Sequence, residues 1–179
     1  MDIDNSISKV TSFIKGLVPY VVLLIIVILF KMFIMTPIRV NGNSMAPTLD
    51  DGDIMILDVI STKVKKLERF DIVVIDQGKE LLIKRIIGLP GETIEYRGGY
   101  LYVNGIEVDD PFYNNYEFTE DMKATVPEGE YYVLGDNRHN SLDSRTFGTF
   151  SKKQIKGKSD FIIYPFYRAG FIEKIGKKK

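Results

Sequence analysis

The chain has 179 residues, of which 24 are basic and 24 are acidic, so its formal net charge is zero. Because no excess of Lys or Arg is present to neutralise phosphates, nucleic acid is a poor candidate partner. The absence of cysteine excludes disulfide frameworks, thiolate zinc sites and cysteine nucleophiles. Hydrophobic residues make up 45% of the chain, which fits one globular domain joined to one membrane segment.

The first predicted element is a transmembrane helix over Leu17 to Met35, which is apolar apart from Tyr20 and Lys31. About 19 residues at about 1.5 Å each span roughly 28 Å, close to the thickness of the hydrocarbon core. Their apolar side chains contribute on the order of −6 kcal/mol to insertion, and a lysine costs about +3 kcal/mol even at the centre. A cleavable signal peptide is the alternative, but bulky residues follow where small ones are needed for cleavage.

Charge alone leaves the orientation of this helix open. Lys9 and Lys15 favour an N-terminus inside the cell, but Lys31 and Arg39 lie on the other flank. The predicted organisation is a short N-terminal segment over residues 1–16, the membrane helix over 17–35 and a β-rich domain over 36–179.

Beyond Pro37 the chain is typical of short strands separated by turns, with little helical periodicity. The clearest turn is Asn104-Gly105, which predicts a two-residue hairpin with a type I′ turn. Asp110 to Lys123 has no clean period and is predicted as a loop. We expect a mainly β fold of coiled antiparallel sheets in a barrel-like domain. The predicted strands are Ile38–Val40, Ile54–Ile60, Asp71–Asp76, Leu81–Ile87, Thr93–Tyr96, Tyr100–Val103, Ile106–Val108, Tyr131–Leu134 and Phe161–Tyr164.

Ser44 and Lys84 are the candidate catalytic residues. Ser44 lies shortly after the membrane segment, between Gly42 and Pro47, which both constrain the backbone, although a lone serine here is usually an ordinary turn residue. Lys84 stands in the apolar run Leu81–Ile87, where loss of hydration disfavours the ammonium and lowers the pKa of the amine. A neutral lysine can then take the proton of a serine hydroxyl. The alternative for Lys84 is an ion pair at a strand edge.

A third polar cluster runs from Gly135 to Arg145. Within it, Ser141 is a candidate to exchange a hydrogen bond with the Lys84 amine, and Asp143 with Arg145 to form an ion pair behind that amine. A polar loop whose side chains only satisfy one another is the alternative. Asp50, Asp51 and Asp53 lack further spaced ligands, so a solvated turn is favoured over a cation site. No metal and no cofactor are expected.

Taken in order, these segments resemble bacterial type I signal peptidases in their Gram-positive form, serine proteases that remove signal peptides from exported proteins. The resemblance rests on the membrane segment, Ser44-Met45-Ala46-Pro47-Thr48-Leu49, Lys84-Arg85-Ile86-Ile87-Gly88-Leu89-Pro90-Gly91, Gly135-Asp136-Asn137-Arg138 and Asn140-Ser141-Leu142-Asp143-Ser144-Arg145. It implies that Ser44 is the nucleophile and Lys84 the general base. It also implies that Ser141 positions Lys84.

The resemblance further implies supporting roles for Asp143 and Arg145, with Asp136 and Arg138 as structural partners. It places the N-terminus in the cytoplasm and the β-rich catalytic domain outside the cell membrane, with preproteins and membrane lipid as partners. Some family members carry a serine where this chain has Gly42, so the Ser44 N–H is expected to carry more of the oxyanion stabilisation. His139, the only histidine, has no required counterpart in the family.

Signal-peptide cleavage sites carry small residues in an A-x-A-like pattern, so two shallow apolar pockets are expected. By analogy with the family, the expected lining residues are Ile38, Val40, Met45, Leu49, Leu82 and Ile83. Plain core packing is the alternative for all six.

Two rival functions remain. A self-cleaving repressor-type protease also pairs serine with lysine, but no DNA-binding module accompanies this pair. A specialised or inactive membrane-tethered relative that acts in pilus or surface-protein assembly is the other. Because Ser44 and Lys84 are both present, an inactive site is disfavoured.

Overall fold

The computed structural model describes residues 3–112 and 121–172, and the chain divides into two units, Met1–Met35 and Thr36–Lys179. In the first unit, α1 spans Ile3–Ile34, and the side chains of residues 12–28 are exposed. In the part of the chain that is described, no helix combines the length and the apolar character needed to cross a membrane. A helix is therefore found where the anchor is expected, and its membrane crossing stays a prediction.

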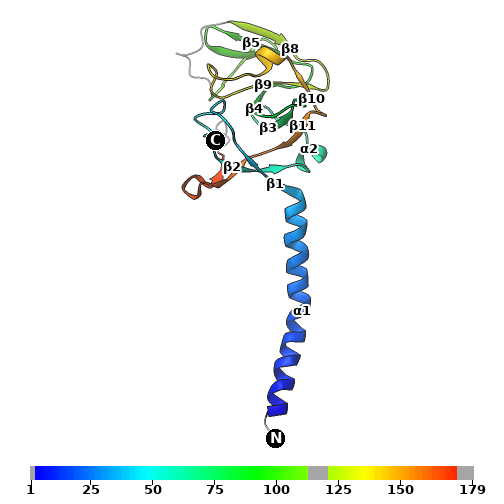
Figure 1. The fold of residues 1–179 in the computed structure, drawn as a ribbon. Coiled ribbons are helices and arrows are strands. Elements are labelled where there is room, and N and C mark those ends of the chain that lie inside the picture. Colours follow the sequence, from blue (N-terminus) through cyan, green and yellow to red (C-terminus); the bar gives the residue numbers. More distant parts are fainter. Residues whose placement is uncertain (1–2, 113–120, 173–179) are drawn as a thin grey trace. The chain divides into compact units, whose positions relative to one another are not determined.

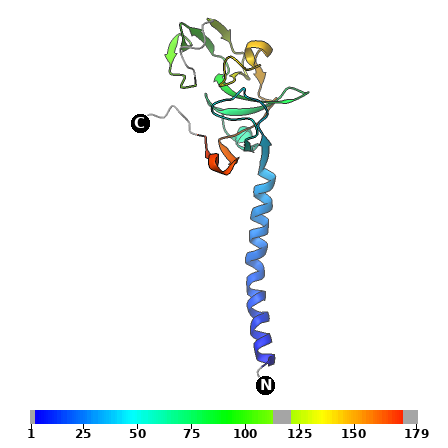
Figure 2. The ribbon, with the colours of Figure 1, turned by 60° about the vertical axis from the view of Figure 1, so that its left-hand side comes forward.

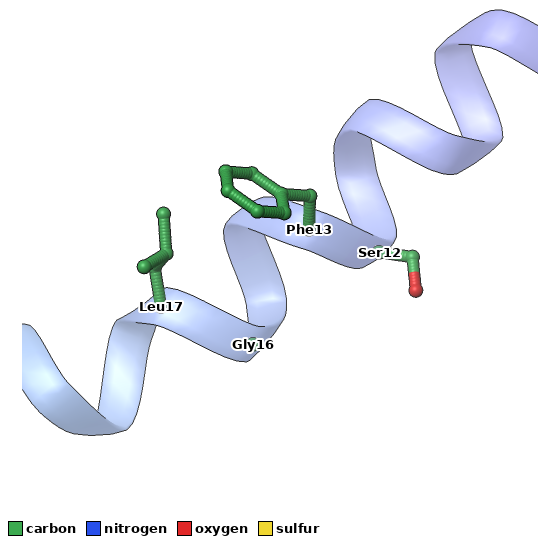
Figure 3. A pocket seen from close by; sticks show the side chains of 4 residues that line it. All are labelled: Ser12, Phe13, Gly16 and Leu17. Atoms are coloured by element: carbon green, nitrogen blue, oxygen red, sulfur yellow. The ribbon is translucent and has the colours of Figure 1, made fainter.

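A shallow hollow on α1 is lined by Ser12, Phe13, Gly16 and Leu17 (Figure 3). Phe13 and Leu17 are four positions apart and lie on the same side of the helix (Figure 3). The hollow is the space that Gly16 leaves by having no side chain. Only Ser12 brings a polar side chain to it, so the hollow offers no chemistry.

The second unit contains, among its described residues, a nine-stranded sheet with the order β10-β9-β4-β3-β11-β2-β12-β13 and with β1 paired to β2. All neighbours in this order are antiparallel. Within these described strands β10 and β13 are the two ends of the order, so the barrel-like closure that we expected is not found. The bounds are β1 (Met35–Arg39), β2 (Ile54–Asp58), β3 (Ile72–Asp76), β4 (Leu81–Gly88), β9 (Glu130–Leu134), β10 (Phe150–Ser151), β11 (Ile155–Lys158), β12 (Phe161–Tyr164) and β13 (Gly170–Phe171).

A second sheet has four strands in the described residues, in the order β7-β6-β5-β8. Its bounds are β5 (Thr93–Arg97), β6 (Tyr100–Val103), β7 (Ile106–Val108) and β8 (Met122–Thr125). Val103 pairs with Ile106 across the turn, and Asn104 and Gly105 both have positive φ, so the predicted type I′ hairpin is confirmed. Residues 113–120 of the predicted loop lie outside the described residues, and β8 occupies part of its remainder.

The larger sheet is buried on both faces at its centre. In β3, Ile72 and Val74 join one apolar cluster, whereas Val73 and Ile75 join another. This alternation is the two-residue period of a strand. Figure 1 shows β3, β4 and β9 between β5 of the smaller sheet and β2. The turned view of Figure 2 again has the smaller sheet and the C-terminal strands on opposite sides of the unit.

The mainly β, antiparallel fold class is confirmed, with several elements that the sequence analysis did not predict. The unpredicted strands are β8, β10, β11 and β13, and the unpredicted helical turns are α2 (Ser61–Val64), α3 (Ser144–Phe147) and η1 (Phe166–Arg168). Each has at most four residues, so its hydrophobic period is weak. None adjoins a turn as clear as Asn104-Gly105, which marked the equally short β6 and β7.

Candidate active site

Ser44 lies in the connection between β1 and β2, and buried neighbours hold this connection in place. The side chains of Met45 and Leu49 belong to an apolar core cluster, and the Leu49 N–H donates to the Met45 carbonyl at 2.9 Å. Ser44 itself is half-buried. The segment therefore anchors its apolar residues inside and keeps the serine near the surface.

Lys84 lies inside β4, and only 3% of its surface is exposed. Its Nζ lies 2.8 Å from Ser44 Oγ and 3.0 Å from the Ile83 carbonyl oxygen. Among the described residues Lys84 takes part in none of the ion pairs. The alternative of an ion-paired lysine at a strand edge therefore does not describe its surroundings.

The electrostatics of Lys84 follow from its burial. Loss of water around the ammonium lowers the pKa of Lys84 below its ordinary value of 10.5, although the negative charges of Asp143 and Asp136 act in the opposite direction. Burial is the largest of these effects, so the net shift is downward. The amine can therefore lose its proton at a lower pH than a lysine in water.

The loop that follows β9 reaches Ser44 because of strand register. Arg85 pairs with Leu134 in the antiparallel β4–β9 ladder, so the residues after Leu134 run past Lys84. A Cβ on Gly135 would lie 2.4 Å from the Ser44 carbonyl oxygen, which explains the glycine. The Asn137 N–H donates to that carbonyl at 3.1 Å, and the Asn137 side chain donates to the Asn43 carbonyl at 3.1 Å.

Asp143 and Arg145 form the expected ion pair, with 2.8 Å between Nη2 and Oδ2. Asp143 is fully buried and also accepts the Gly135 N–H at 3.1 Å. Burial favours a raised pKa, but the hydrogen bonds from Arg145 and Gly135 outweigh it, so the pKa of Asp143 lies below its ordinary value. The carboxylate therefore stays ionised. It links Gly135, at the start of the loop, to Arg145, at its end.

Ser141 is near this group, but the structure does not join it to Lys84. A Cβ on Gly135 would lie 2.2 Å from Ser141 Oγ, which places the hydroxyl beside the Ser44 carbonyl. The hydroxyl is close enough to Asp143 to help lower the pKa of that carboxyl, yet within the described residues this buried oxygen has no hydrogen bond of good geometry. The expected hydrogen bond from Ser141 to the Lys84 amine is therefore not formed in this structure.

Asp136 and Arg138 both lie in buried ion pairs, with partners outside the loop. Arg85 grips Asp136 with two hydrogen bonds, of 2.7 Å from Nε and 2.6 Å from Nη2. Arg138 pairs with Asp110 at 2.7 Å between Nη2 and Oδ2. These contacts tie the loop to β4 on one side and to the residues after β7 on the other.

The six expected pocket residues are divided by the structure. Four of them are buried in one core cluster, namely Val40, Met45, Leu49 and Ile83. Ile38 is half-buried and packs against this cluster. Leu82 packs instead against a second cluster. Side chains that are already buried in the core can supply the floor of a shallow pocket but little of its walls.

Gly42 and the acidic turn are also accounted for. Gly42 has φ of +84° and is exposed, and its N–H donates to Asp51 Oδ1 at 2.7 Å. The Asp50 N–H donates to Asp53 Oδ2 at 2.9 Å. Asp51 therefore holds Gly42, nine positions away. Asp53 is buried, and Asp50 and Asp53 both pair with Arg168, so the predicted solvated turn describes only part of this run.

Sequence reasoning missed Asn137 and Asp110 as individual site residues. Asn137 lay inside a recognised polar cluster, but only the fold shows that it binds two carbonyls of the Ser44 segment. Asp110 carried no signal, because its partner Arg138 is 28 positions away. Gly135 did carry one sequence signal of its role, because it is a glycine directly after a predicted strand.

Comparison with known proteins shows which family this chain resembles. Residues 12–164 match the family described as "Signal peptidase, peptidase S26". The chain is 37% identical over 174 residues to signal peptidase I S of Bacillus subtilis (strain 168), across 90% of this chain and 95% of the relative. It is 40% identical over 168 residues to signal peptidase I of Bacillus caldolyticus, across 86% and 92%. A crystal structure of a signal peptidase I from Enterococcus faecalis V583 is 39% identical, covers 52% of this chain and 97% of that chain, and has a TM-score of 0.48.

Proposed function

Because the chain belongs to the signal peptidase family, peptidase S26, we propose that it is a membrane-bound serine endopeptidase that removes signal peptides from exported preproteins through Ser44 and Lys84. The observation that carries the proposal is the 2.8 Å between Lys84 Nζ and Ser44 Oγ. At this distance a proton can pass directly from the hydroxyl to a neutral amine.

In the proposed reaction, Lys84 takes the Ser44 proton as the hydroxyl oxygen attacks the carbonyl carbon of the scissile peptide. The protonated lysine then delivers this proton to the leaving amine as the peptide bond breaks, and an acyl-enzyme remains. Lys84 next takes a proton from water, which attacks the acyl carbon. The bond between this carbon and Ser44 Oγ then breaks, Lys84 returns the proton to Oγ, and the signal peptide leaves. The lowered pKa of Lys84 supports this role, since a base must be unprotonated when it acts.

We assign oxyanion stabilisation to the Ser44 N–H, with Gly42 leaving space beside it. A Cβ on Gly42 would have no heavy atom within 4 Å, so the space beside Gly42 itself is open. Loss of one oxyanion donor costs about 3 kcal/mol in comparable enzymes, so the orientation of this N–H matters.

Cleavage after small residues fits the surroundings of Ser44. Met45, Val40 and Ile83 are buried against one another, so a substrate side chain next to Ser44 meets a closed apolar floor. A large side chain would need these core residues to move, which densely packed cores resist. Half-buried Ile38 would form the rim. An extended substrate can pair with a neighbouring strand through its backbone.

The membrane anchor is part of the proposal and rests on the sequence of α1. Leu17 to Met35 extends beyond Ile28, the last of its residues whose side chains are described. The exposed apolar side chains of the described part, such as Leu23 and Ile26, are suited to lipid. The N-terminus would then lie in the cytoplasm and the second unit outside. Extraction of membranes with alkaline carbonate and with detergent tests this, because an anchored chain leaves the membrane only in detergent.

The activity is tested with the detergent-solubilised full chain and a preprotein that has an A-x-A-like site. We expect cleavage after the last small residue, read by N-terminal sequencing of the product. Ser44→Ala and Lys84→Arg should each abolish turnover while the protein stays folded, because guanidinium cannot act as a base. Matched controls are Ser151→Ala and Lys156→Arg, on β10 and β11, which should cleave normally. Retained cleavage in either dyad variant refutes the proposal.

A further inference from the structure

Asp110 is a buried carboxylate that no motif in the sequence marks, since it follows β7 outside the polar clusters. Only 9% of its surface is exposed. Its Oδ2 accepts hydrogen bonds from Arg138 Nη2 at 2.7 Å and from the Tyr96 hydroxyl, and its Oδ1 accepts the Phe112 N–H at 3.1 Å. A buried charge persists only when it is paired and hydrogen-bonded, so these contacts hold their members together.

One arm of this network runs from Asp110 through Arg138 to the loop after β9. Arg138 Nη1 donates to the Tyr96 hydroxyl at 2.9 Å, and Nε donates to the Gly135 carbonyl at 3.0 Å. Burial raises the pKa of Tyr96 well above its usual range, so its hydroxyl stays protonated and donates to Asp110. With two contacts fixing the planar guanidinium, its Nε–H is aimed at Gly135.

A second arm runs from Asp110 through Phe112 and Arg85. Asp110 fixes the Phe112 backbone, and the centroid of the Phe112 ring lies 3.4 Å from Arg85 Cζ. Arg85 in turn donates two hydrogen bonds to the Asp136 carboxylate. Both arms therefore end on adjacent residues of one loop, the first on Gly135 and the second on Asp136.

The end points of the two arms directly precede the contact that holds Ser44. The Asn137 N–H binds the Ser44 carbonyl at 3.1 Å, and Gly135 lies against the same oxygen. Arg85 is the neighbour of Lys84 in β4. A change in the position of Gly135 or Asp136 therefore moves Ser44 relative to Lys84.

We propose that Asp110 is a positioning residue for peptide-bond hydrolysis: it fixes Arg138 and Phe112, and through them the loop that sets the Ser44–Lys84 distance. This rests on the proposed function, because it presupposes that Ser44 and Lys84 carry the reaction. Tyr96 belongs to β5, so the network also gives the four-stranded sheet a role as the support of the catalytic loop.

The first test compares Asp110→Asn with Asp109→Asn, a matched change at the exposed neighbour. Kinetics are measured on the detergent-solubilised full chain with a peptide substrate. Asp110→Asn should lower kcat by about 10- to 100-fold with little change in KM, since misplacement by about 1 Å can cost about 100-fold in rate. Asp109→Asn should match the wild type. A wild-type kcat in folded Asp110→Asn overturns the inference.

A second pair of variants separates positioning from general stability. Arg138→Lys keeps a positive charge for Asp110 but cannot reach Tyr96, Asp110 and Gly135 together, so kcat should fall. Tyr96→Phe keeps the ring and should give a smaller loss. Urea unfolding at the assay temperature shows the folded fraction of each variant. If Asp110→Asn does not fold, Arg138→Lys decides, and its wild-type kcat overturns the inference.

Failure of the inference is distinct from failure of the proposed function. Inactive Ser44→Ala with normal kcat in folded Asp110→Asn and Arg138→Lys overturns the positioning role alone. Retained cleavage by Ser44→Ala overturns both. If kcat loss in the variants only follows the folded fraction, Asp110 is structural and the inference is wrong.

Discussion

Ser44 Oγ and Lys84 Nζ lie 2.8 Å apart although 40 positions separate the two residues in the chain. The amine reaches the hydroxyl from a central strand, where Val73 pairs with Lys84 across the β3–β4 ladder. The hydroxyl comes from a connection anchored by Met45 and Leu49 in the core. A central strand and a connection anchored in the core therefore meet at one short contact. In the described part of the chain, no carboxylate forms an ion pair with the Lys84 amine.

The rate of cleavage should rise with pH through the lowered pKa of Lys84. The base acts only when unprotonated, so kcat/KM should fall about tenfold per pH unit below that pKa and reach a plateau above it. Because burial lowers this pKa, the plateau should begin well below the ordinary lysine value of 10.5. The measurement is kcat/KM over a range of pH. A rate that is independent of pH down to about pH 5 contradicts a neutral amine as base.

Stability should depend on the same group. Between the lowered pKa of Lys84 and 10.5, the unfolded chain holds a proton that the folded chain has released. The free energy of unfolding therefore rises with pH across this window, by at most about 1.4 kcal/mol per pH unit for one proton.

Lys84→Met should remove this dependence, because methionine fills similar space without an amine. We expect it to be more stable than the wild type at neutral pH, with the difference shrinking as pH approaches 10.5. Urea unfolding at several pH values measures both quantities. Lys156→Met, at a partly exposed position of β11, is the control and should keep the wild-type slope.

Asp143 and Arg145 should shift the pH profile of cleavage in opposite directions. The charge of Asp143 raises the pKa of Lys84, and the charge of Arg145 lowers it. Asp143→Asn should therefore move the acidic limb of the profile to lower pH, and Arg145→Gln should move it to higher pH. Kinetic pH profiles of both variants provide the check. Shifts of the same sign would show that lost structure, and not charge, dominates.

The pairing of Ser44 with Lys84 could be predicted because both residues lie in segments that carry the family resemblance, although each alone has a commoner interpretation. Lys84 interrupts an apolar run and Ser44 sits between Gly42 and Pro47. The partners of the nearby charges have no such signal, since Arg85 and Asp136 are 51 positions apart. Pairing across such separations follows from strand register, which a single sequence does not reveal.

The missed strands have a similar explanation. β11 is Ile155-Lys156-Gly157-Lys158, in which lysine and glycine hide the alternation of buried residues. Gly157 is needed because a Cβ would lie 2.6 Å from Leu57 Cγ and 2.8 Å from the Asp58 carbonyl. A glycine required by close backbone approach is indistinguishable in sequence from one that marks a turn.

Gly135→Ala should lower the rate of cleavage by more than the loss of folded protein accounts for. Its Cβ would lie 2.4 Å from the Ser44 carbonyl oxygen, a backbone atom that moves only if Ser44 moves. Gly88→Ala is a matched control, because its Cβ would lie 2.8 Å from Val126 Cγ2, away from Ser44. We expect kcat per folded molecule to fall about 100-fold in the first variant and little in the second. Equal kcat loss in both variants would contradict a local effect on Ser44.

Ser141→Ala should lower activity without lowering the free energy of unfolding. The Ser141 hydroxyl is buried without a hydrogen bond among the described residues, and such a group costs about 1–3 kcal/mol. Its removal should therefore leave the free energy of unfolding unchanged or raise it by about 1 kcal/mol. If this hydroxyl turns to the Lys84 amine during the reaction, as the resemblance implies, kcat should fall in the same variant. Thermal unfolding and kcat are measured on one preparation, and Ser151→Ala serves as the control for both. A variant that is destabilised would show that the hydroxyl has a partner in solution, and one with wild-type kcat would remove Ser141 from the site.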